Sequence, residues 1–260
     1  MNNSAVLEAR DLVKRFHGHA VVAGVSFALA PGEILGYLGP NGSGKSMTLK
    51  MLTGLVDPSG GQVWYDRTDV TGGTVEFRRR FGYVPEEPQL YPFLSGLEYL
   101  DLISGLRDLP PRLARDRTRA LLELFGLADG AEQSIGAYSK GMRQKMLLIA
   151  ALLHNPDLII LDEPESGLDV GSILVLRQLI RVLAVRGKAI LYSSHIVENV
   201  ERLCTRVIVL SAGRAVIDGT IDRIRSVAPS GSLEEAFASL AAQRPDAVAY
   251  QIADVVTGHA

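Results

Sequence analysis

One glycine-rich segment, residues 39–46, limits what this chain can fold into more than any other part of the sequence. It matches the pattern GxxxxGK[ST], and it stands between a continuous apolar run, Ile34–Leu38, and a helical pattern that begins at Met47. Such a loop turns its backbone N–H groups inward, and the start of the following helix adds a positive field. The order of buried strand, loop and helix therefore predicts a cradle for phosphate groups.

The side chains of this loop indicate which phosphates it holds. Lys45 is expected to reach the outer phosphates of a nucleoside triphosphate, and Ser46 is expected to ligate Mg²⁺. The alternative is a chance glycine-rich turn, against which the strand before it and the helix after it argue. We therefore predict a site for ATP and Mg²⁺. The residues expected to surround the phosphates are Gly39, Pro40, Asn41, Gly42, Ser43, Gly44, Lys45, Ser46 and Met47.

Two carboxylates follow a second buried strand. The apolar residues 158–161 are followed directly by Asp162 and Glu163. Because ligands of open α/β sheets bind at the carboxyl ends of parallel strands, Asp162 is predicted to hold Mg²⁺ together with Ser46. Glu163 is predicted to polarise an attacking water molecule. The alternative is two solvated acids that end a strand, and the phosphate loop upstream argues against it.

A histidine follows the next apolar strand, which is expected at residues 189–192. His195 stands just past that strand, so we expect it at the same rim of the sheet as Asp162 and Glu163. Its imidazole can form a hydrogen bond with a terminal phosphate. A single histidine in such a place is more often an ordinary rim or capping residue, so this assignment depends on the other motifs.

The wider pattern predicts an α/β fold with a mostly parallel core sheet, because strand-like and helical segments alternate. Two short strands with a turn at residues 17–19 are expected at the N-terminus. Periodic leucine, alanine and arginine residues predict a helical subdomain at about residues 88–150, with helices at 97–106, 113–124 and 141–153. We expect one domain over residues 1–225, followed by a C-terminal helix and tail over residues 226–260.

Composition excludes several classes of protein. Of the 260 residues, 47% are apolar and 22% are charged, which is ordinary for a globular domain and argues against disorder. The formal net charge of −2 gives no electrostatic reason to expect a nucleic-acid partner. A single cysteine, Cys204, favours a reduced, cytosolic protein. The longest uncharged stretch, residues 16–32, is too interrupted by glycine, proline and histidine to cross a membrane.

A further motif, YSKGMRQK at residues 138–145, begins a helical segment just upstream of the acidic strand. With the phosphate loop, Asp162, Glu163, residues 166–169 and His195 in this order, residues 5–225 resemble an ATP-binding-cassette (ABC) nucleotide-binding subunit. The resemblance implies a P-loop NTPase fold with an N-terminal antiparallel β-subdomain and an inserted helical subdomain. Glu163 and His195 then match the catalytic glutamate and the switch histidine of the family.

The resemblance also implies a dimer that shares its ATP. Ser139 and Gly141 match signature residues that bind the γ-phosphate held by the other subunit, which is either a second copy or a paralogue. A serine N-cap at a helix start is also what the local sequence predicts, although a simple capped helix would look the same. Phe16 falls where the family stacks an aromatic ring on adenine, and it is equally typical of an ordinary strand. Asp169 belongs to the same set of nucleotide-binding residues.

Three residues depart from the family pattern. Glu86 stands where glutamine is usual, and a carboxylate near the metal should bind Mg²⁺ more strongly but repel the γ-phosphate. Lys140 replaces a signature glycine at a helix start, where a cation is unfavourable unless an anion is near or the side chain faces solvent. Glu165 adds a carboxylate beside Glu163 where a small polar residue is commoner. Glu86 and Lys140 resemble the exporter type of the family, whose permease is a separate chain. Residues 232–237 resemble the C-terminal helix of that type.

These features together predict an ATPase subunit that powers substrate export through a separate integral-membrane permease and lies peripherally at the cytoplasmic face of the cell membrane. Apolar residues after Glu86 are expected to dock the permease, or else to cover the core of the helical subdomain. The alternative function is a soluble ABC ATPase that acts on nucleic acid, the ribosome or a protein assembly. A P-loop kinase would leave residues 139–144 and His195 without roles. The docking residues are Leu90, Tyr91, Phe93 and Leu94.

Overall fold

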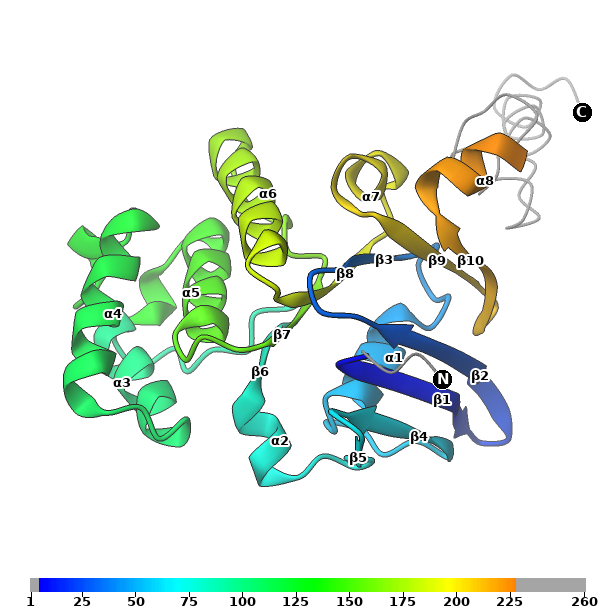
Figure 1. Cartoon of the computed structure of the whole chain (residues 1–260). Coiled ribbons are helices and arrows are strands. Elements are labelled where there is room, and N and C mark those ends of the chain that lie inside the picture. Colours follow the sequence, from blue (N-terminus) through cyan, green and yellow to red (C-terminus); the bar gives the residue numbers. More distant parts are fainter. Residues whose placement is uncertain (1–4, 228–260) are drawn as a thin grey trace, which may run out of the picture.

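The computed structural model describes residues 5–227, which form two β-sheets with α-helices packed around them (Figure 1). The larger sheet has six strands in the order β10-β9-β3-β8-β7-β6, and the smaller has four in the order β2-β1-β4-β5. The strands of the larger sheet are β3 (Ile34–Leu38), β6 (Phe81–Val84), β7 (Leu158–Asp162), β8 (Ala189–Ser194), β9 (Arg206–Ser211) and β10 (Arg214–Thr220). The strands of the smaller sheet are β1 (Leu7–Phe16), β2 (His19–Leu29), β4 (Gly60–Tyr65) and β5 (Thr68–Asp69). The helices are α1 (Lys45–Leu52), α2 (Val75–Arg80), α3 (Gly96–Leu106), α4 (Pro111–Leu124), α5 (Lys140–Leu152), α6 (Val170–Val185), α7 (Val197–Leu203) and α8 (Ile221–Val227).

The direction of the strands confirms the predicted fold class. In the larger sheet β9, β3, β8, β7 and β6 run parallel to one another, and β10 runs antiparallel to β9. The smaller sheet is antiparallel and includes the two N-terminal strands. Helices α3, α4 and α5 stand together to the left of β6 in Figure 1. The mostly parallel core, the antiparallel β-subdomain and the helical subdomain are therefore all present, while the exact domain boundaries stay a prediction.

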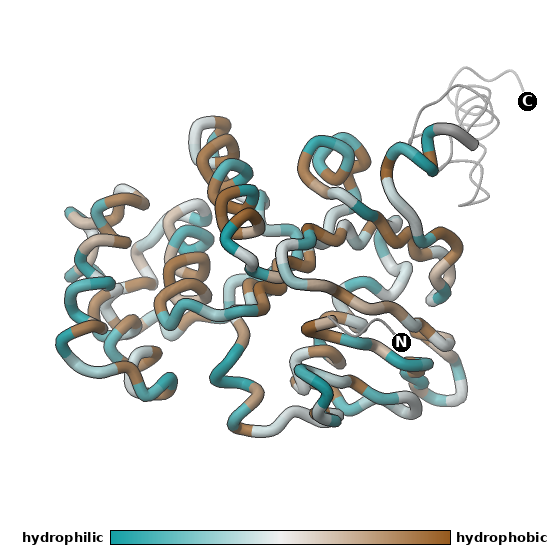
Figure 2. The backbone as a smooth tube through the Cα atoms, viewed as in Figure 1, coloured by the Kyte–Doolittle hydropathy of each residue, from teal (hydrophilic) through white to brown (hydrophobic). Residues whose placement is uncertain are grey.

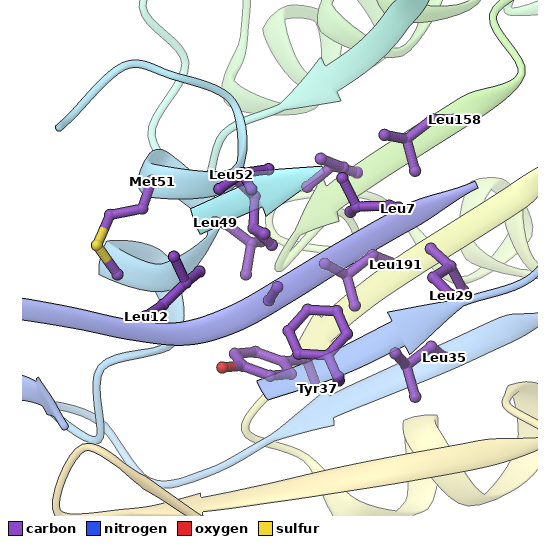
Figure 3. Packing of buried hydrophobic residues seen from close by; sticks show 14 of the residues in the cluster. Leu7, Leu12, Leu29, Leu35, Tyr37, Leu49, Met51, Leu52, Leu158 and Leu191 are labelled. Carbon is purple, nitrogen blue, oxygen red and sulfur yellow. The ribbon is translucent and has the colours of Figure 1, made fainter. Parts of the chain in front are cut away.

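The central strands are apolar along their whole length because both faces of the sheet are covered. Every residue of β3, β7 and β8 is buried. Successive side chains of β3 point to opposite faces, so Leu35 and Tyr37 join a core shared with β1, β2 and α1, as Figure 3 shows. Ile34 and Leu38 join a second core, shared with α5, α6 and α7. This packing holds in place the strand ends from which the predicted site loops emerge.

A third apolar core lies among the helices of the helical subdomain. Leu100 of α3, Leu122 of α4 and Ile149 of α5 are among its buried residues. Figure 2 shows hydrophobic and hydrophilic residues alternating along α4, as expected for a helix with one face in a core. Helix α3 starts with a capping box, in which Ser95 and Glu98 each accept a hydrogen bond from the other's backbone N–H group.

The structure adds short elements that the sequence pattern does not predict. Strand β5 and helices α2 and α7 have two, six and seven residues, which is too short for a periodic pattern to show. Helix α1 begins at Lys45, inside the glycine-rich motif, rather than at Met47. The C-terminal helix expected around residues 232–237 lies outside the described residues. None of the helices in residues 5–227 combines the length and the apolar character that crossing a membrane requires.

Candidate functional site

The phosphate loop connects β3 to α1 and passes so close to its neighbours that glycine is required. Gly44 has a φ of +102°, a conformation that side chains with a Cβ rarely adopt, and a Cβ there would lie 2.8 Å from the carbonyl oxygen of Val21. A Cβ on Gly39 would lie 2.8 Å from the carbonyl oxygen of Leu210. The loop therefore closes tightly on β2 and on the end of β9, as the predicted cradle requires.

Lys45 folds back over the loop instead of extending into solvent. Its Nζ donates a hydrogen bond to the carbonyl oxygen of Gly39 at 2.7 Å, and the residue is only 7% exposed. Burial lowers the pKa of Lys45, while the carboxylates of Glu163, Asp162 and Glu86 oppose that shift. Three acids thus face one ammonium group. A triphosphate bound in this loop therefore needs a further cation beside it.

Asp162 is completely buried at the end of β7. Neither of its carboxylate oxygens has a hydrogen-bond partner among residues 5–227. Burial raises the pKa of Asp162, and the nearby hydroxyls of Ser46 and Ser193 and the charge on Lys45 oppose that rise without completing a hydrogen bond to it. A buried carboxylate without partners is costly unless a cation neutralises it. These residues therefore fit the predicted Mg²⁺, which proteins bind through one or two carboxylates together with phosphate oxygens and water.

Glu163 and His195 meet across the ends of β7 and β8. Oε1 of Glu163 lies 2.8 Å from Nδ1 of His195. Glu163 has a φ of +47°, and its N–H donates to the carbonyl oxygen of Ser193 at 3.2 Å. A left-handed backbone at a residue other than glycine costs energy and is concentrated at functional sites. The Glu163 side chain is 12% exposed and the His195 side chain 49%, so the carboxylate is shielded while the imidazole faces solvent.

A cavity of about 320 Å³ opens between these groups. It brings together most of the phosphate loop and two of the three predicted acids, Glu86 and Glu163. Val21 of β2 also lines it. The sequence does not predict this contact because nothing in an apolar strand residue signals a ligand. The lining residues are Val21, Asn41, Gly42, Gly44, Lys45, Ser46, Met47, Glu86 and Glu163.

Several residues predicted to contact the nucleotide or its metal do not line this cavity, namely Phe16, Gly39, Pro40, Ser43, Asp162, Asp169 and His195. Phe16, at the end of β1, is 44% exposed, and the centroid of its ring lies 5.2 Å from Nζ of Lys14. Asp169 caps α6, where its carboxylate accepts hydrogen bonds from the N–H of Ser172 at 2.9 Å and from the hydroxyl of Ser172 at 2.6 Å. The roles of Phe16 and Asp169 toward a nucleotide stay predictions.

The signature-like segment also lies away from the cavity. Ser139 caps α5, and its Oγ accepts a hydrogen bond from the N–H of Met142 at 3.2 Å. A Cβ on Gly141 would lie 2.8 Å from the carbonyl oxygen of Gly167, and the aliphatic stem of Lys140 packs against the same glycine. The start of α5 is therefore packed on the turn at residues 166–169. The assignment of Ser139 and Gly141 to the nucleotide of another subunit stays a prediction.

Of the two glutamates that depart from the family pattern, one lies at the candidate site and the other does not. Oε2 of Glu86 lies 3.4 Å from Oγ of Ser46, beside the predicted metal ligands. Glu165 does not line the cavity with Glu163, because its carboxylate turns to α6 and accepts two hydrogen bonds from Arg177. Within residues 5–227 no three His, Cys, Asp or Glu side chains form a ready-made metal site. A metal at Ser46 would therefore complete its coordination with phosphate oxygens and water.

A larger hollow of about 660 Å³ lies between α4, the end of α5 and α6. Its walls are mostly apolar, with Leu124 and Val175 among them, and it contains none of the predicted site residues. The convergence of the glycine-rich loop, Lys45 and the acids, rather than the size of a cavity, therefore identifies the candidate site.

A glycine-rich phosphate loop at the carboxyl edge of a mostly parallel sheet, with an acid pair at the end of a nearby strand, defines the class of P-loop nucleotide-binding proteins. Residues 22–166 match the family model described as ABC transporter. The chain belongs to the ABC transporter family.

Relatives and solved structures agree with this family. An uncharacterized ABC transporter ATP-binding protein of Nostoc sp. is 41% identical over 77% of this chain and 60% of its own length. The Nod factor export ATP-binding protein I of Burkholderia thailandensis is 38% identical over 83% of this chain and 71% of its own length. A solved ATP binding subunit of an ABC transporter is 34% identical with a TM-score of 0.85, over 90% of this chain and 99% of that chain. The aligned part thus spans about three fifths of the Nostoc relative and nearly all of the solved subunit.

Glu86→Gln tests whether Glu86 contacts the metal. A neutral amide attracts Mg²⁺ less than a carboxylate does, so we expect the Mg²⁺ concentration for half-maximal ATP turnover to rise about three- to tenfold. Glu87→Gln, at the exposed neighbouring residue, is the control and should leave the Mg²⁺ dependence unchanged. The measurement is a Mg²⁺ titration of ATPase activity. An unchanged Mg²⁺ dependence in Glu86→Gln would place Glu86 outside the coordination sphere.

Proposed function

We propose that this chain is the ATP-hydrolysing subunit of an ABC transporter that exports its substrate through a separate membrane permease. One observation carries the proposal: Lys45 and Glu163 line the same cavity, and Glu163 contacts His195 at 2.8 Å. The buried carboxylate of Asp162 lies near enough to Lys45 to oppose the lowering of the Lys45 pKa. Family membership supports ATP as the nucleotide. Export is supported by the names of two relatives, the Nod factor export protein and the linearmycin resistance ATP-binding protein LnrL of Bacillus subtilis, which is 35% identical over 83% of this chain.

The phosphate loop binds and orients the triphosphate. The free backbone N–H groups at the start of α1 face the phosphate oxygens, and the helix field favours their negative charge. The Lys45 ammonium, which in the protein alone is bonded to the carbonyl oxygen of Gly39, is close enough to exchange that partner for a phosphate oxygen. Mg²⁺ held by Ser46 and Asp162 would neutralise phosphate charge and favour in-line transfer of the γ-phosphoryl group.

Glu163 prepares the attacking water. Its carboxylate accepts a hydrogen bond from a water molecule and polarises that water for in-line attack on the γ-phosphorus. A protonated imidazole donates from both ring nitrogens, so His195 in that form can hold Glu163 through Nδ1 and the γ-phosphate through Nε2. The 2.8 Å contact between the two side chains thereby couples the orientation of the base to the presence of the γ-phosphate.

A second nucleotide-binding subunit completes the site in this proposal. Ser139 and the start of the 13-residue helix α5 lie away from the chain's own cavity, although a serine-capped helix start is suited to binding an anion. We assign them, with Gly141, to the γ-phosphate held by the other subunit, which is a copy of this chain or a paralogue. Two shared ATP molecules then close the dimer before hydrolysis, and phosphate release reopens it.

An exposed aromatic pair after Glu86 supports a permease partner. Tyr91 is 51% and Phe93 75% exposed, and their ring centroids lie 5.9 Å apart. Leu90 and Leu94 are instead partly buried against the apolar cores, so they cover the core rather than offering a docking surface. Clustered exposed aromatic rings are typical of protein interaction sites. We assign Tyr91 and Phe93 to contact with the permease at the cytoplasmic face of the membrane.

Glu163→Gln tests the chemistry and the shared site together. An amide is a poor base, so we expect ATP turnover to fall by about 10²- to 10⁴-fold while ATP still binds through Lys45 and the loop. Because the bound ATP persists, the variant should form a stable dimer with ATP and Mg²⁺ in light-scattering measurements. Adding Ser139→Glu should abolish that dimer through repulsion of the γ-phosphate.

Two results would contradict these roles. Normal turnover by Glu163→Gln would exclude Glu163 as the base. An ATP-dependent dimer that persists after Ser139→Glu would exclude Ser139 from the shared site.

The docking surface is tested by changing Tyr91 and Phe93 to serine together. We expect most of the binding to vesicles that contain the permease to be lost, because two exposed aromatic anchors are removed. Leu124→Ser, at a leucine that is 79% exposed on α4, is the control and should bind normally. Sedimentation with the vesicles measures the bound fraction. Unchanged binding would contradict this surface, and co-sedimentation with ribosomes or DNA instead would favour a soluble ABC ATPase.

A further inference from the structure

Three polar side chains form a closed hydrogen-bonded ring to which the mechanism above gives no role. Glu165 accepts hydrogen bonds from Nε of Arg177 at 2.7 Å through Oε1 and from Nη2 at 2.8 Å through Oε2. The same Nη2 donates to Oδ1 of Asn199 at 2.8 Å, and Nδ2 of Asn199 donates to Oε2 of Glu165 at 3.0 Å. Each member therefore contacts the other two, and we call this set the Glu165 ring.

The Glu165 ring is shielded from solvent. The side chains of Arg177 and Glu165 are 15% and 11% exposed, and hydrogen bonding to Glu165 raises the pKa of Arg177. Burial raises the pKa of Tyr192 in β8, and the negative charge of Glu165 adds to that rise. A bidentate arginine–carboxylate pair fixes the relative orientation of its two side chains. Removing one member leaves the other charge buried and uncompensated. The ring is therefore a stiff connection between the segments that carry it.

Those segments are the ones that also carry the catalytic pair. Glu165 stands two residues after Glu163, in the turn between β7 and α6. Asn199 stands four residues after His195, in α7, which follows β8. Arg177 in the middle of α6 joins the two, and Figure 1 shows α6 and α7 standing on the same side of the sheet. The ring thus links the chain just after Glu163 to the chain just after His195.

The other hydrogen bonds of the turn that carries Glu163 do not reach α7. Glu163 is held at a φ of +47°, from which an unrestrained backbone would relax. Within the turn, the N–H of Ser166 donates to the carbonyl oxygen of Glu163 at 3.1 Å, and Nε2 of Gln144 donates to that of Pro164 at 3.0 Å. Together with the bond from the Glu163 N–H to the carbonyl oxygen of Ser193, these bonds fix the turn to itself, to α5 and to β8. The hydrogen bonds that fix it to α7 run through the Glu165 ring.

We propose that Glu165, Arg177 and Asn199 are positioning residues that hold the Glu163 carboxylate and the His195 imidazole at their 2.8 Å contact. The inference rests on the proposed function, since it takes Glu163 as the group that polarises water. No member of the ring lines the nucleotide cavity. Loss of the ring therefore lowers turnover and leaves ATP binding unaffected. Glu165, which stands where a small polar residue is commoner in the family, then has a defined role.

Arg177→Met keeps the apolar stem of the side chain but removes every donor to the ring. We expect kcat for ATP hydrolysis to fall about 10- to 100-fold because a misplaced base is costly, while the Kd for ATP stays within about twofold of its native value. Arg177→Lys, which keeps the charge, should recover part of the lost turnover. Asn199→Ala leaves the ion pair intact, so it should fold and give a smaller loss of kcat.

Arg202→Met is the matched control on α7. It removes an ion pair with Glu198 in which both side chains are more than half exposed, and it should leave kcat unchanged. Parallel losses of kcat and ATP affinity in Arg177→Met would show a general structural defect and overturn the inference. An unchanged kcat in both Arg177→Met and Asn199→Ala would also overturn it.

A comparison in the Glu163→Gln background separates positioning from other effects. If the ring acts through the Glu163 carboxylate, adding Arg177→Met should lower the residual turnover by less than about twofold. A further loss as large as in the native background would show that Arg177 acts elsewhere and would overturn the inference. Full turnover by Glu163→Gln alone would refute the proposed function, and the inference with it. If Glu163→Gln loses turnover while Arg177→Met turns over ATP normally, the positioning role of the ring is refuted and the proposed function is not.

Discussion

The parallel pairing of β3, β8 and β7 is the interaction on which the site depends. Leu38 of β3 pairs with Ser194 of β8, and Asp162 of β7 pairs with Ser193, so the three strands end within a residue of one another. The phosphate loop, the turn that carries Glu163 and the segment that carries His195 therefore start side by side. A slip of one residue moves a strand end by about 3.3 Å and reverses its side chains, which would separate Glu163 from His195.

Apolar packing on both faces of the sheet concentrates charge at this edge. Lys45 is almost completely buried and Asp162 is completely buried. Burial lowers the pKa of Lys45 and raises the pKa of Asp162, so it favours the uncharged form of both. Their mutual attraction offsets part of that cost, but three acids still face one ammonium group, and the Asp162 oxygens lack hydrogen-bond partners among residues 5–227. A triphosphate with its metal would supply both the missing cation and a new partner for Lys45. Buried charges that lack partners within the protein are what a site that binds such a ligand requires.

The sequence predicts the features that neighbouring residues determine, and it does not predict those that depend on contacts between distant segments. Strand β3 begins and ends at the predicted residues because a strand buried on both faces must be apolar throughout, and the phosphate loop follows from the spacing of its glycines. The sequence places the carboxylate of Glu165 near that of Glu163, but in the structure it pairs with Arg177 of α6. No local pattern predicts an ion pair with a residue on another element. The exposure of Tyr91 and Phe93 beside two partly buried leucines is likewise decided by tertiary packing.

In the proposed function, one edge of the parallel sheet holds one triphosphate between the phosphate loop and the Glu163–His195 pair. A crystal structure of the chain with Mg²⁺ and a non-hydrolysable ATP analogue measures this directly. We expect a γ-phosphate oxygen within hydrogen-bond distance of Nζ of Lys45, and Mg²⁺ about 2.1 Å from Oγ of Ser46 and held by Asp162 directly or through one water molecule. A γ-phosphate remote from Lys45, or a metal with no link to Ser46 and Asp162, would contradict it.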